Sequence, residues 1–274
     1  PTTHGERLVL RLLDKQAGRI GLDGLGMAPT TGAAFTELLG QPHGILLVTG
    51  PTGSGKTTTL YAALQSLDAA RLNIVTVEDP VEFDLPGVGQ IAVNPRIELD
   101  FARALRAILR QDPDVIMIGE IRDLETAQIA IQASLTGHLV LATLHTNDSA
   151  AALTRLVDMG IEPFLLASTL RGVLAQRLVR KLCPDCRQPA TTMQGWEAGQ
   201  CGHCGHSGYR GRAGIYELLV VDEALRRLIH DGADEDRLRT HARAAGMRSL
   251  HEDGLRHVAS GLTSAAELQR VIRA

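Results

Sequence analysis

The 274-residue sequence predicts an α/β fold, and two observations carry this prediction. Short β-branched runs alternate with helix-like stretches, which is the pattern of a sheet whose faces are covered by helices. One apolar run is also followed at once by a glycine-rich loop and a helix-like segment, a strand-loop-helix unit suited to binding phosphate. A tetracysteine insert and a small helical C-terminal part complete the predicted architecture.

The chain opens on a short predicted strand, because Leu8, Leu10 and Leu12 alternate with residues 7, 9 and 11. This strand is too short to form a domain. We therefore expect residues 1–24 to be the remnant of a truncated N-terminal domain and its linker. The α/β core is expected to span residues 25–180 and to begin with a helix over 31–39.

The segment Gly50–Thr57 matches the phosphate-loop pattern G-x-x-x-x-G-K-[ST], between the apolar run 45–49 and a helix-like stretch over 58–67. Its glycines let the backbone approach an anion, while Lys56 reaches the β and γ oxygens and the Thr57 hydroxyl binds Mg²⁺. The predicted nucleotide-binding residues are Gly50, Thr52, Gly53, Ser54, Gly55, Lys56, Thr57 and Thr58. The sequence therefore predicts a nucleoside triphosphate site.

Later β-branched runs each end near a residue capable of acid–base chemistry. The runs cover residues 74–77, 115–118 and 139–143, and the helix-like stretches between them cover 101–110 and 124–134. Glu78, Glu120 and His145 follow the three runs. Because ligands of open parallel sheets bind at the carboxyl ends of the strands, we expect these side chains to converge on the phosphates.

Glu120 is the predicted catalytic carboxylate, since it follows an apolar strand and can polarise the attacking water or hold a water on Mg²⁺. A surface glutamate at a strand end is the alternative. Glu78 and Asp79 stay at the mouth of their strand because Pro80 stops it. Glu78 is the preferred candidate for orienting the water or the metal shell, whereas Asp79 alternatively caps a turn.

Two histidines bracket the run 139–143. His145 at its carboxyl end is placed to sense the γ-phosphate, whereas His138 at the other end is harder to bring there. On the pattern alone, a structural role is the more common one for a single histidine.

Arg103, Arg106 and Arg110 form a stripe opposite the apolar face of the 101–110 helix. The pattern alone favours a solvated face. The functional alternative is that these arginines supply transition-state charge or a subunit contact.

All four cysteines fall in two C-x-x-C pairs, Cys183 with Cys186 and Cys201 with Cys204, separated by fourteen residues. This spacing is close to that of a zinc ribbon, so we expect an insert over 181–212 that binds Zn²⁺ through four thiolates. His203 and His206 are competing ligands, and disulfides are an alternative that an intracellular phosphate-loop protein disfavours. The helical C-terminal part is expected over 213–274.

Composition argues against nucleic acid as a partner, because the net charge is -3 and aromatic residues make up only 3% of the chain. No apolar run approaches the roughly 18 residues of a membrane span, and no signal peptide is evident. We expect a soluble protein of the cytoplasmic side.

Several stretches together resemble the secretion and pilus-assembly ATPases of bacterial type II secretion and type IV pili. The stretches that carry the resemblance are residues 4–7, 11–14, 76–80, 106–123, 136–138, 144–147 and 208–212. The resemblance spans nearly the whole chain, and it is strongest to the branch that serves type II secretion.

This resemblance implies a RecA-like domain that forms hexameric rings, with sequence motifs named the Walker A, Asp, Walker B and His boxes. It implies that Glu120 is the catalytic glutamate, that Glu78 belongs to the Asp box, and that His138 and His145 belong to the His box. Arg11, Arg106 and Arg110 become candidates for arginines that approach the phosphates. The cysteine pairs match the family's zinc-binding subdomain, although the gap between them is short for the family.

The implied function is that of a cytoplasmic motor that hydrolyses ATP with Mg²⁺ to power pseudopilus assembly in type II secretion. The implied partners are further copies of the chain and inner-membrane platform proteins, which alone bring it to the membrane. No nucleic-acid partner is expected. Alternatives are a type IV pilus extension ATPase, a nucleotide-gated scaffold and, less favoured, a DNA translocase. Family members carry a further N-terminal region, so we expect weak activity from this chain alone.

Overall fold

The computed structural model describes residues 5–6, 20–190 and 195–273. Its central feature, within those residues, is a seven-stranded sheet in the order β3-β2-β4-β5-β1-β6-β9. The strands are β1 (Gly44–Thr49), β2 (Ile74–Glu78), β3 (Val88–Ala92), β4 (Val115–Ile118), β5 (Leu139–Leu144), β6 (Leu170–Leu182) and β9 (Tyr209–Val220). Neighbouring strands are parallel except for the antiparallel pair β6 and β9. The α/β prediction is confirmed.

Both faces of the parallel strands are buried, which explains why their sequences are continuous apolar runs. Along β1, Ile45 and Leu47 pack into one core while Leu46 and Val48 pack into a second core on the opposite face. Each strand therefore contributes alternate side chains to two separate hydrophobic layers.

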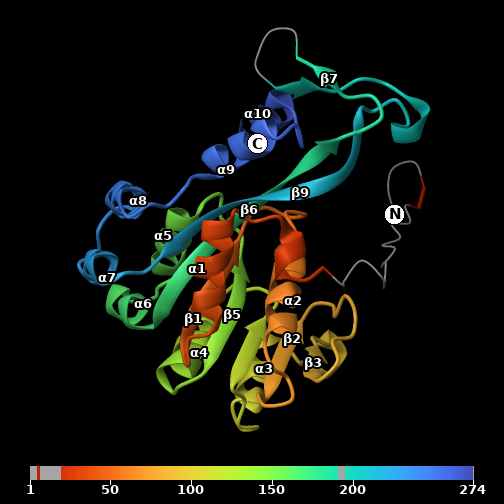
Figure 1. Cartoon of the computed structure of the whole chain (residues 1–274). Helices are drawn as coiled ribbons and strands as arrows, with labels where there is room; N and C mark the ends of the chain where they lie inside the picture. Colours follow the sequence, from red (N-terminus) through yellow and green to blue (C-terminus); the bar gives the residue numbers. More distant parts are fainter. Residues whose placement is uncertain (1–4, 7–19, 191–194, 274) are drawn as a thin grey trace.

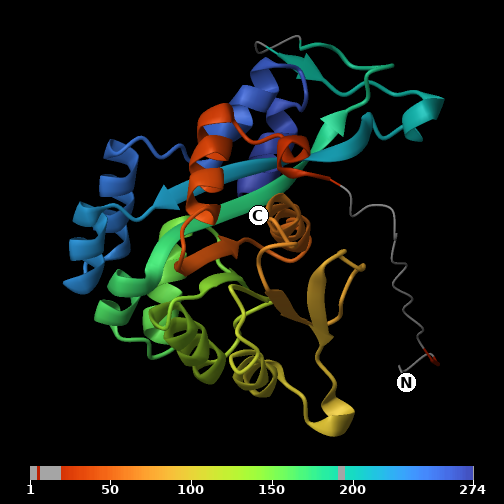
Figure 2. The ribbon, with the colours of Figure 1, turned by 60° about the horizontal axis from the view of Figure 1, so that its bottom comes forward.

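Helices cover each face of the sheet, as Figures 1 and 2 show. One face is covered by the 3-10 helix η1 (Leu22–Leu25), α1 (Pro29–Leu39) and α2 (Lys56–Ser66). The other face is covered by α3 (Phe101–Ile108), α4 (Leu124–Leu135), α5 (Ser149–Asp158), α6 (Pro163–Thr169), α7 (Glu223–His230) and α8 (Glu235–Ala244). The short 3-10 helix η2 (Pro95–Ile97) precedes α3.

The strands β6 and β9 run beyond the parallel sheet and form a long antiparallel ribbon (Figure 1). Its outer half packs against α9 (Leu250–Ala259) and α10 (Ala265–Arg273) in a third apolar cluster. At its far end lie β7 (Gln188–Pro189), β8 (Trp196–Glu197) and the 3-10 helix η3 (Gly202–Cys204). Cys183 and Cys186 lie between β6 and β7, and Cys201 and Cys204 lie at the start and end of η3.

The ribbon also marks where the structure differs from the organisation expected from the sequence. The boundaries placed after residues 180 and 212 fall inside β6 and β9, because each strand belongs both to the central sheet and to the arm that holds the cysteines. The strand expected over residues 7–13 lies outside the described residues, and so does Arg11. Within the described residues, no helix is both long enough and apolar enough to cross a membrane.

Candidate nucleotide-binding site

The phosphate loop joins β1 to α2, as the sequence predicts. Gly50 has a φ of 148°, and a Cβ atom there would lie 2.3 Å from the carbonyl oxygen of Gln176 on β6. Gly55 has a φ of 89° and precedes α2, whose first turn receives no side-chain cap. The unpaired backbone N–H groups and the positive end of the helix dipole therefore favour an anion at this point.

Lys56 is the first residue of α2, and its side chain is largely buried. The Lys56 ammonium donates hydrogen bonds to the carbonyl oxygens of Gly50 at 2.7 Å and Pro51 at 3.2 Å. Burial lowers the pKa of Lys56, and the nearby Glu120 carboxylate partly opposes this shift. A buried ammonium whose two shortest contacts are loop carbonyl oxygens is suited to exchanging them for phosphate oxygens.

Glu120 and His145 meet the lysine from two neighbouring strands. The Nε2 atom of His145 lies 3.5 Å from a carboxylate oxygen of Glu120, and the Nδ1 atom lies 3.5 Å from the nitrogen of Lys56. Glu120 also accepts a hydrogen bond from Arg122, which raises the pKa of that guanidinium. The structure thus brings Lys56, Glu120 and His145 into one cluster.

Glu78 lies at the end of β2 and is buried. Its carboxylate accepts hydrogen bonds from the Tyr61 hydroxyl, from Thr76 Oγ1 at 2.7 Å and from Gln90 Nε2 at 3.0 Å. Burial raises the pKa of Tyr61, and the hydrogen bond to Glu78 adds to this rise. These hydrogen bonds hold the Glu78 side chain in one position at the edge of the site.

These groups line a single cavity of about 500 Å³ at the carboxyl ends of the parallel strands. The cavity is bounded by the phosphate loop, Glu78, Asp79, Glu120, His145 and Arg212 of β9. Its size is in the range of small-molecule and cofactor sites.

Other predicted residues lie elsewhere in the described structure. His138 lies at the opposite end of β5, where its Nδ1 atom is 2.8 Å from the carbonyl oxygen of Ala133. Arg106 is exposed and pairs with Glu125, and Arg110 is exposed near the end of α3. None of these three lines the cavity.

Two residues at the loop were not predicted as site residues. The Nε2 atom of Gln176 donates a 2.7 Å hydrogen bond to the carbonyl oxygen of Ser54, so β6 supports the loop from behind. Arg212 faces the cavity from β9. Arg212 lies in one of the stretches that carry the family resemblance, which was the available signal, whereas nothing in the sequence around Gln176 marks its contact.

The four cysteines come together at the end of the ribbon, with their sulfur atoms within 4.8 Å of one another. The distances are 3.8 Å for Cys183 to Cys201, 3.8 Å for Cys186 to Cys204 and 3.6 Å for Cys201 to Cys204. All four are free thiols, which excludes the disulfide alternative in this structure. A tetrahedral ion with metal–sulfur bonds of about 2.3 Å requires sulfur separations of about 3.8 Å, so the group fits such an ion.

The surroundings of Cys204 favour a thiolate. Burial alone would raise its pKa, but backbone hydrogen bonds with Cys201 and Gly208 hold it at about 6. The Gly208 N–H lies 3.2 Å from the Cys204 sulfur. His203 instead lies 3.1 Å from Asp185, and among the described residues neither His203 nor His206 joins the sulfur group.

A parallel sheet with a phosphate loop after β1 and carboxylates after β2 and β4 defines a P-loop nucleotide-binding protein. The family described as "Type II/IV secretion system protein" matches residues 1–270. The chain belongs to this family.

Curated relatives cover the whole chain. It is 68% identical to the type II secretion system protein HxcR of Pseudomonas aeruginosa and 57% identical to the type II secretion system ATPase E of Vibrio cholerae, over 100% of its length in each case. The chain spans 58% and 57% of the length of these two relatives.

Among solved structures, the pilus retraction motor PilT with bound ADP is 32% identical, with a TM-score of 0.72. The likeness covers 91% of this chain and 66% of PilT. The ATPase DotB of Legionella pneumophila is 25% identical, with a TM-score of 0.69, over 91% of this chain and 64% of DotB.

Proposed function

We propose that this chain is the ATP-hydrolysing part of a motor for type II protein secretion. The observation that carries the proposal is the single cavity in which the phosphate loop, Lys56, Glu120 and His145 meet. One relative named for type II secretion is 68% identical, against 32% for the pilus retraction motor, which supports a secretion motor over a pilus motor.

In the proposed reaction, the loop N–H groups and Lys56 bind the triphosphate, with Lys56 moving from the carbonyl oxygens of Gly50 and Pro51 to the β and γ oxygens. Mg²⁺ held by the Thr57 hydroxyl would neutralise charge on the β- and γ-phosphates. Glu120 orients a water and accepts its proton as the water oxygen bonds to the γ-phosphorus and the bond from that phosphorus to the ADP oxygen breaks. His145 lies between Glu120 and Lys56, so it is placed to sense whether the γ-phosphate is present.

Glu78 and the remaining predicted residues have more indirect roles. Because Glu78 is already committed to three donors, we assign it to fixing the cavity wall and the water shell of the metal. Arg106 and Arg110 are exposed and away from the cavity, so we propose that they act on the nucleotide of a neighbouring copy in a ring. Arg11 is a further candidate, and His138 acts at the amino end of β5.

The cysteine group is proposed as a structural Zn²⁺ site. Its four sulfur atoms lie within 4.8 Å of one another, and three of their separations are 3.6 to 3.8 Å, which matches the ligand number and size for this ion. The ion would tie the tip of the β6–β9 ribbon without taking part in hydrolysis.

The wider setting is proposed from the family and the relatives. We place the protein in a homo-hexamer at the cytoplasmic face of the inner membrane, held there by secretion platform proteins. No contact with nucleic acid is proposed.

Phosphate release from Mg-ATP by the full-length protein tests this function. Lys56→Ala is expected to abolish release, whereas Lys181→Ala, a lysine on β6 outside the cavity, is expected to keep it. Equal rates in the wild type and Lys56→Ala would overturn the proposal.

A further inference from the structure

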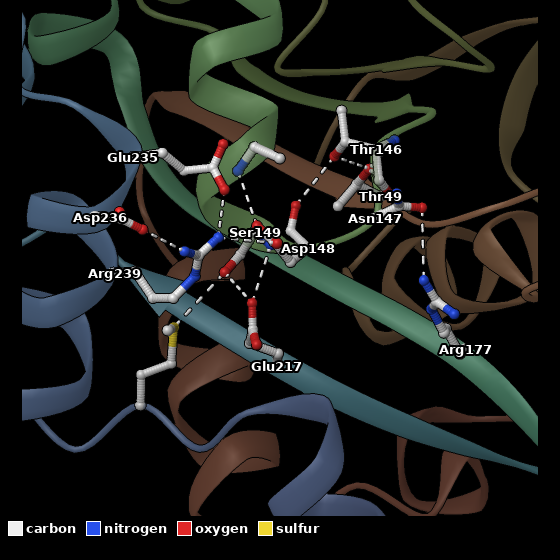
Figure 3. Close-up of polar contacts among 12 residues, drawn as sticks. Thr49, Thr146, Asn147, Asp148, Ser149, Arg177, Glu217, Glu235, Asp236 and Arg239 are labelled. Atoms are coloured by element: carbon white, nitrogen blue, oxygen red, sulfur yellow. Dashed lines mark hydrogen bonds and ion pairs between the residues drawn. The ribbon is translucent and has the colours of Figure 1, made fainter. Parts of the chain in front are cut away.

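The segment that follows His145, made of the loop 146–148 and Ser149 at the start of α5, contacts four different elements of the fold. Thr146, Asn147, Asp148 and Ser149 are consecutive, and Figure 3 shows that each contacts a residue from another strand or helix. Such a loop connects the nucleotide cavity at one end with β9 and α8 at the other.

The first tie joins the loop to the phosphate loop. The hydroxyls of Thr146 and Thr49 lie 2.7 Å apart, and the Thr146 N–H donates to Thr49 Oγ1 at 2.9 Å. Thr49 is buried, ends β1 and directly precedes Gly50. A shift of the phosphate loop on nucleotide binding would therefore be felt by the residue next to His145.

The next tie is to a buried arginine. Arg177 of β6 is 8% exposed, and its guanidinium lies 3.5 Å from the side-chain oxygen of Asn147. Its other guanidinium contact is the carbonyl oxygen of Val271 in α10, and its Nε atom has no hydrogen-bond partner. The 3.5 Å contact between Arg177 and Asn147 is longer, and therefore weaker, than the hydrogen bonds made by Thr146 and Ser149.

The last two contacts join Ser149 and Asp148 to residues in the C-terminal third of the chain. The buried carboxylate of Glu217 in β9 accepts from Ser149 Oγ at 2.5 Å and from the Ser149 N–H at 3.0 Å. Asp148 caps α5 through one oxygen and pairs through the other with Arg239 of α8 at 3.1 Å. A helix cap alone needs only the first of these oxygens, so the pair with Arg239 is an additional contact.

Arg239 is shared among competing carboxylates. Besides Asp148, it pairs with Glu235 and with Asp236 at 3.0 Å, both on its own helix. An arginine that already has two local partners can release Asp148 at little cost, which makes this contact adjustable.

We propose that Glu217 and Arg239 are positioning residues for His145, through which α8 and β9 respond to the nucleotide. This inference rests on the proposed function of the cavity. Both residues act through the loop, because neither lines the cavity. Loss of the Arg239 contact would free the Asp148 end of the loop and let His145 leave its place between Glu120 and Lys56.

Steady-state hydrolysis of Mg-ATP by the full-length protein tests the proposal in a double-mutant cycle. Arg239→Ala is expected to lower kcat roughly 3- to 30-fold, with KM changed less than about twofold. In a His145→Ala background the same substitution should change kcat less than about twofold, because Arg239 acts through His145. Glu217→Met should behave like Arg239→Ala, since it keeps roughly the side-chain size but cannot accept the two hydrogen bonds from Ser149.

Arg243→Ala is the matched control, because Arg243 lies on the same helix and pairs with Glu252 away from the loop. It should leave kcat unchanged. A kcat for Arg239→Ala equal to that of the wild type, or losses that add in the double variant, would overturn the proposal.

If His145→Ala has no measurable turnover, the double-mutant cycle has no reference rate. Hydrogen exchange then tests whether α8 responds to the nucleotide through Arg239. With a non-hydrolysable Mg-ATP analogue, which keeps the γ-phosphate that His145 is proposed to sense, exchange over residues 145–149 and α8 should slow in the wild type and in Arg243→Ala, but not over α8 in Arg239→Ala. Equal slowing over α8 in all three would reject the coupling. If the wild type releases no phosphate from Mg-ATP, the proposed function itself fails; if it does and Arg239→Ala is indistinguishable from it, only this inference fails.

Discussion

The nucleotide cavity and the C-terminal helices both contain buried charge, but they pair it differently. In the cavity, Lys56 is held by two carbonyl oxygens, and His145 lies 3.5 Å from both Lys56 and Glu120. In α10, the buried Glu267 accepts hydrogen bonds from the guanidinium of Arg180 at 2.7 Å and from Arg270 at 2.7 and 2.8 Å.

The difference separates a working site from a structural anchor. Burial disfavours the Glu267 carboxylate, yet its hydrogen bonds from Arg270 and Arg180 hold its pKa at about 2, so its charge is fully matched within the fold. Burial lowers the pKa of Lys56, and the nearby Glu120 carboxylate only partly opposes this shift, since no carboxylate bonds directly to the ammonium among its contacts in the described residues. Charge left incompletely paired in a cavity is the signature expected of a group whose partner is a ligand.

The largest expected effect comes from the phosphate loop. Gly50→Ala would place a Cβ atom 2.3 Å from the Gln176 carbonyl oxygen, so the loop must shift and Mg-ADP affinity should fall about 100-fold. Gly232→Ala is the matched control, because Gly232 lies outside the cavity and a Cβ atom there meets nothing within 4 Å, although its φ of 68° adds strain of about 1 kcal/mol. Titration calorimetry checks both variants, and equal affinities for them would contradict the loop geometry.

The cysteine group should behave as a structural element independent of the cavity. Cys204→Ser removes the sulfur that the Gly208 N–H contacts, so bound zinc should fall from equimolar toward zero and the ribbon tip should lose stability. Zinc analysis and limited proteolysis measure these effects. Mg-ADP affinity should stay unchanged, and a parallel loss of nucleotide binding would show that the two regions are coupled.

Acid should weaken the C-terminal helices in two steps. Burial lowers the pKa of His257 below its usual 6.5, so the stability it contributes is present above pH 6.5 and is lost as the pH falls below that value. Glu267, with a pKa of about 2 against an ordinary 4.5, contributes stability above pH 4.5 that is lost as the pH falls toward 2.

Glu267→Gln should therefore cost about 2 kcal/mol at pH 7 and flatten the pH dependence between pH 4.5 and 2. Denaturant unfolding followed across this pH range measures the change. Glu223→Gln, an exposed member of a surface pair, should cost at most about 0.5 kcal/mol and serves as the control. An unaltered pH profile in Glu267→Gln would remove Glu267 from its anchoring role.

The smallest effect on the isolated chain is expected for Arg106. Its pair with Glu125 is more than half exposed on both sides, so Arg106→Ala should change the free energy of unfolding by no more than about 0.5 kcal/mol. The Arg106→Ala substitution should lower ATP turnover only in the assembled full-length protein, where Arg106 can reach the nucleotide of a neighbouring copy. A loss of turnover in a monomeric sample would place Arg106 at its own cavity instead.

The parallel core was predictable from the sequence because its strands are apolar runs, and the phosphate loop, Glu120 and His145 each follow one of them. The helix and strand positions around Gly50–Thr57, Glu120 and His145 are confirmed to within one or two residues. The ribbon formed by β6 and β9 was not predicted, since β6 carries arginines there whose partners, Val271 and Glu267 of α10, come within reach only after the chain folds. The contacts of Gln176 and Glu217 likewise join residues far apart in sequence, for which no local pattern exists.

The roles of Arg106, Arg110 and His138 were inferred from the family, and the fold of one chain does not bring them to the cavity. A side chain that acts across a subunit boundary leaves no trace in the geometry of a single copy. These assignments stay predictions.

Phosphate release by Glu120→Gln in the full-length protein tests the central claim most directly. The amide keeps the size of the carboxylate but cannot accept a proton from the attacking water, so release should fall roughly 10²- to 10⁴-fold while Mg-ATP still binds. Release within about threefold of the wild-type rate would remove Glu120 from the reaction, because a group worth so little does not act as the catalytic base.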